Sequence, residues 1–284
     1  MPLLFEKMPV LDRYNFCRRS NYQAFLYGKG MDIGGGTITR EEIDELDDHP
    51  ELTRISIAGL HQDTFDYFVT TYGDRFEAIF FFKNKMVGDL SALSTLNNVK
   101  SLAYFLNQRA VSLWDMSGNK SLSMLCIDDF SRLHSLNGIE TAPSLKVLDF
   151  GNMVWATSEY DIIPDLEDSP LEDISFNAEL SYENIYKFLG IKGLKELDFR
   201  SNLCKAEFLA WICSNYPHLN GRCLAPYYLY NETQGFINGK RKPHIDITNE
   251  KHRIKMEKAV ADFDKMKQRF LGLSFSEIMT LINK

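Results

Sequence analysis

The 284-residue sequence lacks the apolar stretches of a membrane or secreted protein. No apolar run approaches the roughly 18 residues that cross a bilayer. The N-terminal stretch is interrupted by Glu6, Lys7 and Asp12, so it has no long apolar core typical of a secretory signal. We therefore expect a cytoplasmic protein that does not bind a membrane.

Cysteine is scarce, and its spacing fits neither disulfides nor a zinc site. There are five cysteines, an odd number, and none forms a C-x-x-C pair. This usage is typical of reduced, cytosolic proteins. No loop clusters the oxygen ligands that calcium prefers, although a metal bridged between neighbouring carboxylates stays an alternative. We expect no bound metal.

The sequence also has fewer basic than acidic residues, and it lacks common catalytic motifs. The net charge of −7 disfavours nucleic-acid binding, which needs cations to displace counterions from phosphates. The sequence has no H-E-x-x-H, G-x-S-x-G or Walker motif, and its six histidines are scattered. We expect no catalytic residues and no cofactor.

Two segments keep an enzymatic alternative open. The glycine-rich Asp32–Thr37 segment, DIGGGT, is similar to the phosphate loop of actin-like and Hsp70-like ATPases. That fold needs two such loops, and only one is present, so a nucleotide-dependent enzyme or switch is the lesser hypothesis. Cys126 and Cys223 occupy outward strand positions, but no histidine takes a matching position.

The recurring element of the sequence is a nine-residue pattern, L-x-x-L-x-F-x-x-N, which is clearest from Leu194 to Asn202. Apolar residues at relative positions 0, +3 and +5 are typical of the strand of a leucine-rich repeat, and asparagine at +8 favours a turn. Eight copies start at Leu52, Phe76, Val99, Leu122, Leu145, Leu171, Leu194 and Leu219. Their spacings are 24, 23, 23, 23, 26, 23 and 25 residues, within the roughly 20–29 expected. The last copy is degenerate.

The period predicts an α/β fold: a leucine-rich-repeat solenoid with a curved parallel sheet on the concave face and mixed short helices and loops on the convex face. We predict an N-terminal cap over residues 1–40, a repeat array over 41–226 and a C-terminal cap over 227–284. The C-terminal cap should contain an amphipathic helix over 249–270.

Local signals predict the remaining elements. A strand is expected over 22–27, and Thr39 with Glu42 predicts a capped helix through Leu46. Helices are expected over 63–73 and 205–217, whereas the returns over 112–121 and 134–144 should be irregular. Extended segments should follow Pro226, and Ser274 with Glu277 predicts a final capped helix.

Charge divides unevenly along the chain. Residues 239–284 contain 11 Lys or Arg and 6 Asp or Glu, a net charge of +5, which leaves −12 on the rest. A solvated helix face would explain the basic tail. Alternatively, Lys240, Arg241 and Lys242 contact an acidic partner or a phosphate.

Four segments resemble a group of bacterial intracellular leucine-rich-repeat proteins that have no established activity. They are residues 58–84, 113–151, 206–221 and the GKRKP turn at 239–243. The resemblance extends over most of the chain from Asp32 to Phe270. It implies a ribonuclease-inhibitor-like or internalin-like horseshoe, a bacterial cytoplasmic origin and protein binding. No catalytic residues follow from it.

Side chains at +4 and +6 of each repeat should form the exposed concave face, because they alternate with the buried positions. An aromatic patch and an acidic stripe are expected there, with Arg200 beside the stripe. The candidate partner-binding residues are Phe80, Phe82, Phe105, Asp128, Asp149, Asp198 and Arg200. Exposed phenylalanines and clustered carboxylates favour a protein partner with an apolar and basic surface.

The function expected is therefore non-enzymatic protein binding by a monomer. Two simpler explanations stay open: the N-terminal segment or another loop covers the phenylalanines, and the aspartates are ordinary solvated surface. A bacterial immunity or antitoxin-type protein is a special case of protein binding that rests on analogy.

Overall fold

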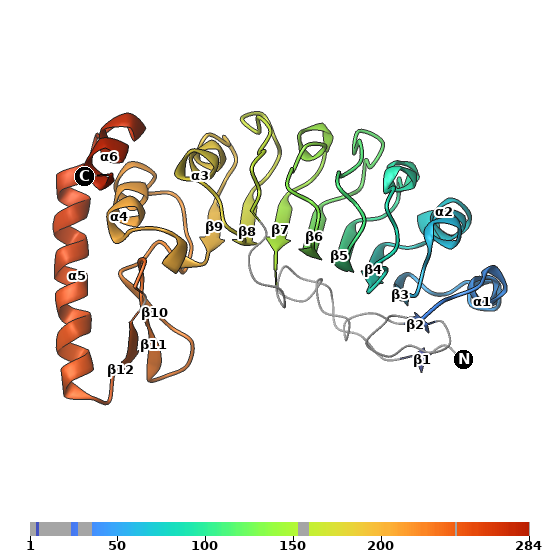
Figure 1. Ribbon diagram of the computed structural model, residues 1–284, viewed down its shortest axis with the longest axis horizontal. Coiled ribbons are helices and arrows are strands. Elements are labelled where there is room, and N and C mark those ends of the chain that lie inside the picture. Colours follow the sequence, from blue (N-terminus) through green and yellow to red (C-terminus); the bar gives the residue numbers. More distant parts are fainter. Residues whose placement is uncertain (1–3, 6–23, 28–35, 153–158, 242, 284) are drawn as a thin grey trace. The chain divides into compact units, whose positions relative to one another are not determined.

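The computed structural model describes residues 4–5, 24–27, 36–152, 159–241 and 243–283 (Figure 1). These residues form a mixed α/β structure, so the predicted class is confirmed. The chain divides into two compact units, Met1–Leu171 and Glu172–Lys284. The predicted cap boundaries at residues 40 and 226 stay predictions.

The first unit is built on strands that pair in chain order. The strands are β1 (Leu4–Phe5), β2 (Ala24–Tyr27), β3 (Arg54–Ala58), β4 (Ala78–Phe82), β5 (Ser101–Asn107), β6 (Met124–Phe130) and β7 (Val147–Gly151). β1 pairs antiparallel with β2, and every later pair is parallel. β2 confirms the strand predicted over 22–27.

The register of the parallel pairs follows the repeat. Each residue at +3 pairs with the +3 residue of the next strand: Ile55, Ile79, Leu102, Leu125 and Leu148. All five are buried. Because a slip of one residue would turn these side chains to the other face, burial of the +3 positions fixes the pairing.

Aromatic residues at +5 connect this core to the return segments. Phe65 and Phe68 of α2 (Gln62–Thr71) lie with ring centroids 5.3 and 6.0 Å from that of Phe81. Phe81 in turn stacks on Tyr104 at 5.2 Å. The buried side of the sheet therefore carries a continuous row of rings that links neighbouring repeats.

The returns of the first unit differ in structure, as predicted. α1 (Arg40–Asp44) has the expected Thr39–Glu42 capping box and continues as the 3-10 helix η2 (Glu45–Asp48). α1 and α2 lie on the same side of the sheet (Figure 1). The 3-10 helix η3 (Gly73–Arg75) follows α2 in the same return. Of the later described returns, the one before β5 contains only the 3-10 helix η4 (Ser91–Thr95), and the one before β7 contains only η5 (Ile139–Thr141).

Strands β3 to β6 share a backbone conformation near their C-terminal ends. The residue at +7 has a positive φ in four successive repeats: Gly59, Lys83, Leu106 and Asp129. In two of these repeats the +8 residue is an asparagine, Asn84 or Asn107, whose side-chain amide forms hydrogen bonds with backbone N–H and C=O groups. Asn84 Nδ2 donates to Ile57 O at 3.0 Å and its Oδ1 accepts from Leu60 N at 2.8 Å. The predicted turn role of these asparagines is confirmed.

The second unit begins with two parallel strands, β8 (Asp173–Asn177) and β9 (Glu196–Phe199). Between them lies α3 (Tyr182–Leu189), a helix that the repeat pattern does not predict. The 3-10 helix η6 (Ser201–Leu203) and α4 (Ala206–Asn215) follow β9. The degenerate eighth copy forms only one bridge, between Glu196 and Asn220.

The end of the chain matches the sequence predictions. β10 (Tyr227–Leu229), β11 (Gln234–Ile237) and β12 (His244–Asp246) form an antiparallel sheet. Asn249 caps α5 (Glu250–Phe270), and Ser274 with Glu277 caps α6 (Phe275–Ile282). Trp211 Nε1 of α4 donates to Leu273 O at 2.8 Å, which helps to hold this helical pair on α4.

Leu197→Ala should lower the free energy of unfolding by roughly 2–5 kcal/mol, because Leu197 is fully buried and its loss leaves a cavity. Leu229→Ala, at a side chain that is 37% exposed, is the matched control and should change stability by much less. Urea unfolding measures both. Equal effects would contradict the register of β9.

Candidate functional site

The candidate residues of the first unit lie on one face of its sheet. Residues at +4 and +6 alternate with the buried +3 and +5 positions, so their side chains share the opposite side. We call this the +4/+6 face. It consists of Ser56, Ala58, Phe80, Phe82, Ala103, Phe105, Cys126, Asp128, Asp149 and Gly151.

Three phenylalanines meet on this face, as the sequence predicts. The Phe80 and Phe82 centroids are 5.9 Å apart, and Phe82 stacks on Phe105 at 5.6 Å with an interplanar angle of 17°. Phe82 and Phe105 are half-buried and pack against an apolar cluster. Phe80, however, is only 4% exposed, so the expectation that it is solvent-exposed is wrong. The part of this aromatic cluster that solvent reaches is therefore mainly the Phe82–Phe105 pair.

The acidic residues of the first unit also meet, but not as a uniform solvated stripe. Asp128 is 7% exposed, whereas Asp149 is half-buried. Cys126 Sγ donates to Asp128 Oδ2 at 3.5 Å. Burial, with a contribution from the charges of Asp149 and Asp129, raises the pKa of Asp128 to about 8. Asp128 is thus mostly uncharged at neutral pH.

The other two candidates, Asp198 and Arg200, belong to the second unit. Arg222 Nε and Nη2 both donate to Asp198 Oδ2 at 2.7 Å, and Cys223 N donates to Asp198 Oδ1 at 3.2 Å. This ion pair places the positive charge of Arg222 beside Asp198, and the predicted role of Asp198 in an acidic stripe stays a prediction. Arg200 is exposed.

The cysteine environments do not favour a nucleophile. Cys126, Cys204 and Cys223 are buried, and Cys213 is partly buried; all four are free thiols. Burial raises the pKa of the Cys204 thiol to about 12 and that of Cys213 to about 11. Burial and the neighbouring Asp198 raise the pKa of Cys223 well above its ordinary value. A thiolate nucleophile needs the opposite shift.

The glycine-rich DIGGGT segment lies only partly within the described residues, which begin again at Gly36. Thr37 borders an open pocket of about 420 Å³ that Glu41 and Asp63 also line. Because Arg40 also lines this pocket, its side chains carry one positive and two negative charges, and the net negative charge disfavours a phosphate.

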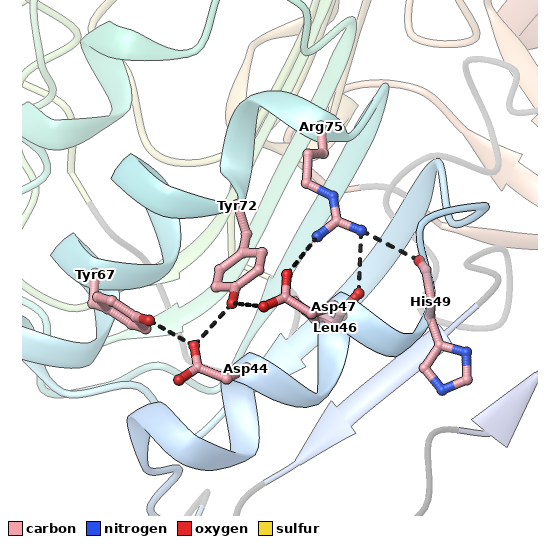
Figure 2. A network of polar contacts seen from close by, with 7 residues as sticks. All are labelled: Asp44, Leu46, Asp47, His49, Tyr67, Tyr72 and Arg75. Carbon is pink, nitrogen blue, oxygen red and sulfur yellow. Dashed lines mark hydrogen bonds and ion pairs between the residues drawn. The ribbon is translucent and has the colours of Figure 1, made fainter.

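A polar network that the sequence analysis missed joins the first two returns (Figure 2). Tyr67 Oη donates to Asp44 Oδ1 at 2.6 Å, and Tyr72 Oη lies 2.9 Å from Asp44 Oδ1 and 3.1 Å from Asp47 Oδ2. Arg75 Nη2 donates to the carbonyls of Leu46 at 3.1 Å and His49 at 3.3 Å. The partners are 23 to 29 residues apart, one repeat, which is the signal that could have revealed them.

This network fits a structural role. Its two acids accept bonds from the two tyrosines, and Arg75 Nη1 lies 3.6 Å from Asp47 Oδ1. Burial and the bonds to Asp44 and Asp47 raise the pKa of Tyr72. The network therefore fixes η2 against α2 and η3, because its polar groups satisfy one another.

No group of three or more His, Cys, Asp or Glu side chains in the described parts could hold a metal ion. Within the same residues, no helix combines the length and apolar character needed to cross a membrane. Comparison with protein-family models, curated proteins and solved structures gives no match.

Tyr72→Phe should lower the free energy of unfolding by about 1 kcal/mol, because it removes the hydroxyl shared by Asp44 and Asp47. Tyr227→Phe, at a half-exposed ring, is the matched control. Thermal unfolding of both variants measures the effect. No difference between them would mean that the network contributes nothing to stability.

Asp128→Asn should change how stability depends on pH. Folding raises the pKa of Asp128 from 3.8 to about 8, so the folded state binds the extra proton between these values. This carboxyl therefore makes the protein less stable as pH rises through that window, by up to about 1.4 kcal/mol per pH unit. The asparagine variant should lack this decline.

The measurement is urea unfolding of wild type and Asp128→Asn at each unit from pH 5 to 9. Asp63→Asn, at an exposed position, is the control and should retain the wild-type pH dependence. Parallel pH profiles for wild type and Asp128→Asn would contradict the raised pKa.

Proposed function

We propose that this chain is a leucine-rich-repeat solenoid that binds a protein partner through the +4/+6 face of its first unit. The observation that carries the proposal is the stacked, half-buried Phe82–Phe105 pair, which lies on the same face as half-buried Asp149. A surface that combines aromatic rings with charge is typical of protein interfaces.

The solenoid assignment is supported by the agreement between the sequence period and the strand register. Copies that start 23 or 24 residues apart pair residue for residue from β3 to β7. In such an array, strands about 4.8 Å apart place equivalent side chains in columns. Columns of this kind present a broad surface with little conformational freedom.

Rigidity is the proposed mechanism of binding. Phe82 and Phe105 are held by stacking and by the apolar cluster beneath them, which includes Ala103 and Cys126. Side chains that are already ordered lose little entropy on association, so more of the contact energy appears as affinity. An apolar side chain of the partner would cover the exposed parts of the two rings.

Charge defines the second part of the partner. Asp149 favours a lysine or arginine on the opposite surface, and Asp128 lies on the next strand, near enough for its pKa to respond to Asp149. A cation brought by the partner would favour the ionised form of Asp128 as well. The proposed ligand is therefore a protein surface with an apolar side chain beside a basic one.

The Phe82→Ala/Asp149→Lys double variant tests this proposal. We expect a protein that wild type captures from lysate of the source organism to bind at least about 100-fold more weakly to the variant, since one aromatic anchor and one charge contact are lost. Calorimetry with the purified partner measures the affinity, and thermal unfolding confirms that the variant is folded.

Met86→Ala/Asp63→Lys is the matched control. It removes one exposed apolar side chain and reverses one exposed carboxylate, both in return segments rather than on the +4/+6 face. The control should bind like wild type. Equal weakening by both double variants would show that net charge, and not this face, determines binding. Unchanged binding by Phe82→Ala/Asp149→Lys would place the site elsewhere.

A further inference from the structure

The outer side of α5 carries an exposed apolar side chain among lysines. The buried residues of this helix, Phe263 and Phe270, mark its inner side, and α5 lies against α4. Ile254 is nine residues from Phe263, about two and a half turns, and therefore lies on the opposite side of the helix. It is 59% exposed. Lys251 and Lys258 lie one turn before and one turn after it, and both are exposed.

The lysines continue in a line along this side of the helix. Lys251, Lys258 and Lys265 recur every seven residues, so they share the side of the helix that carries Ile254. Lys265 Nζ lies 3.9 Å from Asp262 Oδ1, so its charge is partly compensated. A single exposed isoleucine is common on protein surfaces. Its position between two exposed cations gives it the chemistry proposed above for the ligand of the +4/+6 face. We call Lys251, Ile254, Lys258 and Lys265 the α5 patch.

The +4/+6 face has the complementary charge. Its acidic side chains are Asp128 and Asp149, and none of its residues is a lysine or an arginine. The same complementarity extends to the whole chain, since residues 239–284 carry a net charge of +5 and the rest carries −12. Two copies of this chain would therefore attract each other when the basic end of one approaches the acidic part of the other.

The +4/+6 face also determines the direction in which a basic helix would bind. Lys83 Nζ lies 5.1 Å from the ring centroid of Phe82, so a cation already occupies the β4 end of the aromatic pair. A second cation is disfavoured there, whereas an apolar side chain is not. The carboxyl groups of Asp128 and Asp149 lie on β6 and β7, beyond the Phe82–Phe105 pair. An apolar group should therefore bind at the rings and a lysine toward β7.

The spacing of the two surfaces fits this arrangement. Phe105 on β5 and Asp149 on β7 are two strands apart, about 10 Å. Ile254 and Lys258 are four residues apart on α5, about 6 Å along the helix axis. The flexible four-carbon stem of a lysine adds about 6 Å when it is extended. Lys258 Nζ can therefore reach Asp149 while Ile254 lies over the rings.

We infer that the protein partner of the +4/+6 face is a second copy of this chain, which binds through its α5 patch. This inference rests on the proposed function, and it replaces the monomer expected from the sequence with an assembly. Ile254 of one copy would cover the exposed parts of Phe82 and Phe105 of the other. Lys258 would pair with Asp149. Because the contact joins two different surfaces, each added copy leaves one face and one patch unused, so the copies form an open chain or a ring.

Sedimentation equilibrium of the full chain, from micromolar to millimolar concentration, tests the inference. We expect the average mass of the wild type to rise with protein concentration beyond that of a single chain. The association should weaken as salt is added, because salt screens the attraction between exposed charges. A mass that stays that of one chain at every concentration would overturn the inference.

The Ile254→Ala/Lys258→Glu variant should associate at least about 100-fold more weakly, since it loses the apolar contact and reverses the charge opposite Asp149. Leu271→Ala/Lys240→Glu is the matched control. It makes the same two changes at exposed positions outside the α5 patch, and it should associate like wild type. Equal weakening in the two double variants would contradict a role of the patch.

A mixing experiment tests whether the two surfaces bind each other. The Phe82→Ala/Asp149→Lys variant keeps the α5 patch, and the Ile254→Ala/Lys258→Glu variant keeps the +4/+6 face. Each should be monomeric alone, whereas a mixture should form dimers. These dimers cannot grow, because the remaining face and the remaining patch are both altered. A mixture that stays monomeric would contradict the pairing of face with patch.

The outcome can be separated from that of the proposed function. A wild type that stays monomeric, but captures a different protein from lysate through the +4/+6 face, would contradict only the inference of a second copy. If the wild type assembles and Phe82→Ala/Asp149→Lys assembles equally well, the +4/+6 face is not the contact, and this inference is wrong. If lysate yields no other protein while the wild type assembles as described, the second copy is itself the partner.

Discussion

The first unit depends on the pairing of equivalent positions in neighbouring strands. The chain returns to the sheet after 23 or 24 residues, and each return places the +3 residue beside the previous +3 residue. This one constraint buries the aliphatic row, stacks Phe81 on Tyr104 and aligns the side chains of the opposite face. The Phe82–Phe105 pair is thus a consequence of the same register that forms the core, because both rings occupy +6 of adjacent repeats.

Periodic and local signals allowed much of the fold to be predicted from the sequence. The +3 and +5 residues gave the positions of β3 to β9, and capping residues gave the starts of α1 and α6. α3 was not predicted because it lies between two copies of the strand pattern, and that pattern contains no information about helices. The apolar residues of α3 that become buried are Ile185, Phe188 and Leu189. The eighth copy does not form a full strand, because it has too few apolar residues to bury one against the sheet.

The candidate site was harder to predict, since it depends on contacts that a period does not encode. The alternation of side chains along each strand correctly placed Phe80 and Asp128 on the +4/+6 face, but it could not show that both side chains are buried. The pairing of Asp198 with Arg222 joins residues one repeat apart, and only the geometry of the second unit brings them together. The basic turn at Lys240 was visible in the sequence as charge, whereas the buried, unpaired oxygen of Asn238 beside it in the chain was not.

The recurrence of a left-handed residue at +7 has a consequence for how such a chain can change in length. Gly59, Lys83, Leu106 and Asp129 occupy the same position near the ends of four successive strands, so these repeats share one backbone pattern. Duplication or loss of one whole unit preserves every remaining pair and widens or narrows the face by about one strand spacing. Insertion of a single residue within a strand would instead turn the following side chains to the wrong side. The architecture therefore permits evolutionary change in steps of an entire repeat, and the width of the +4/+6 face can change while the core of each remaining repeat stays the same.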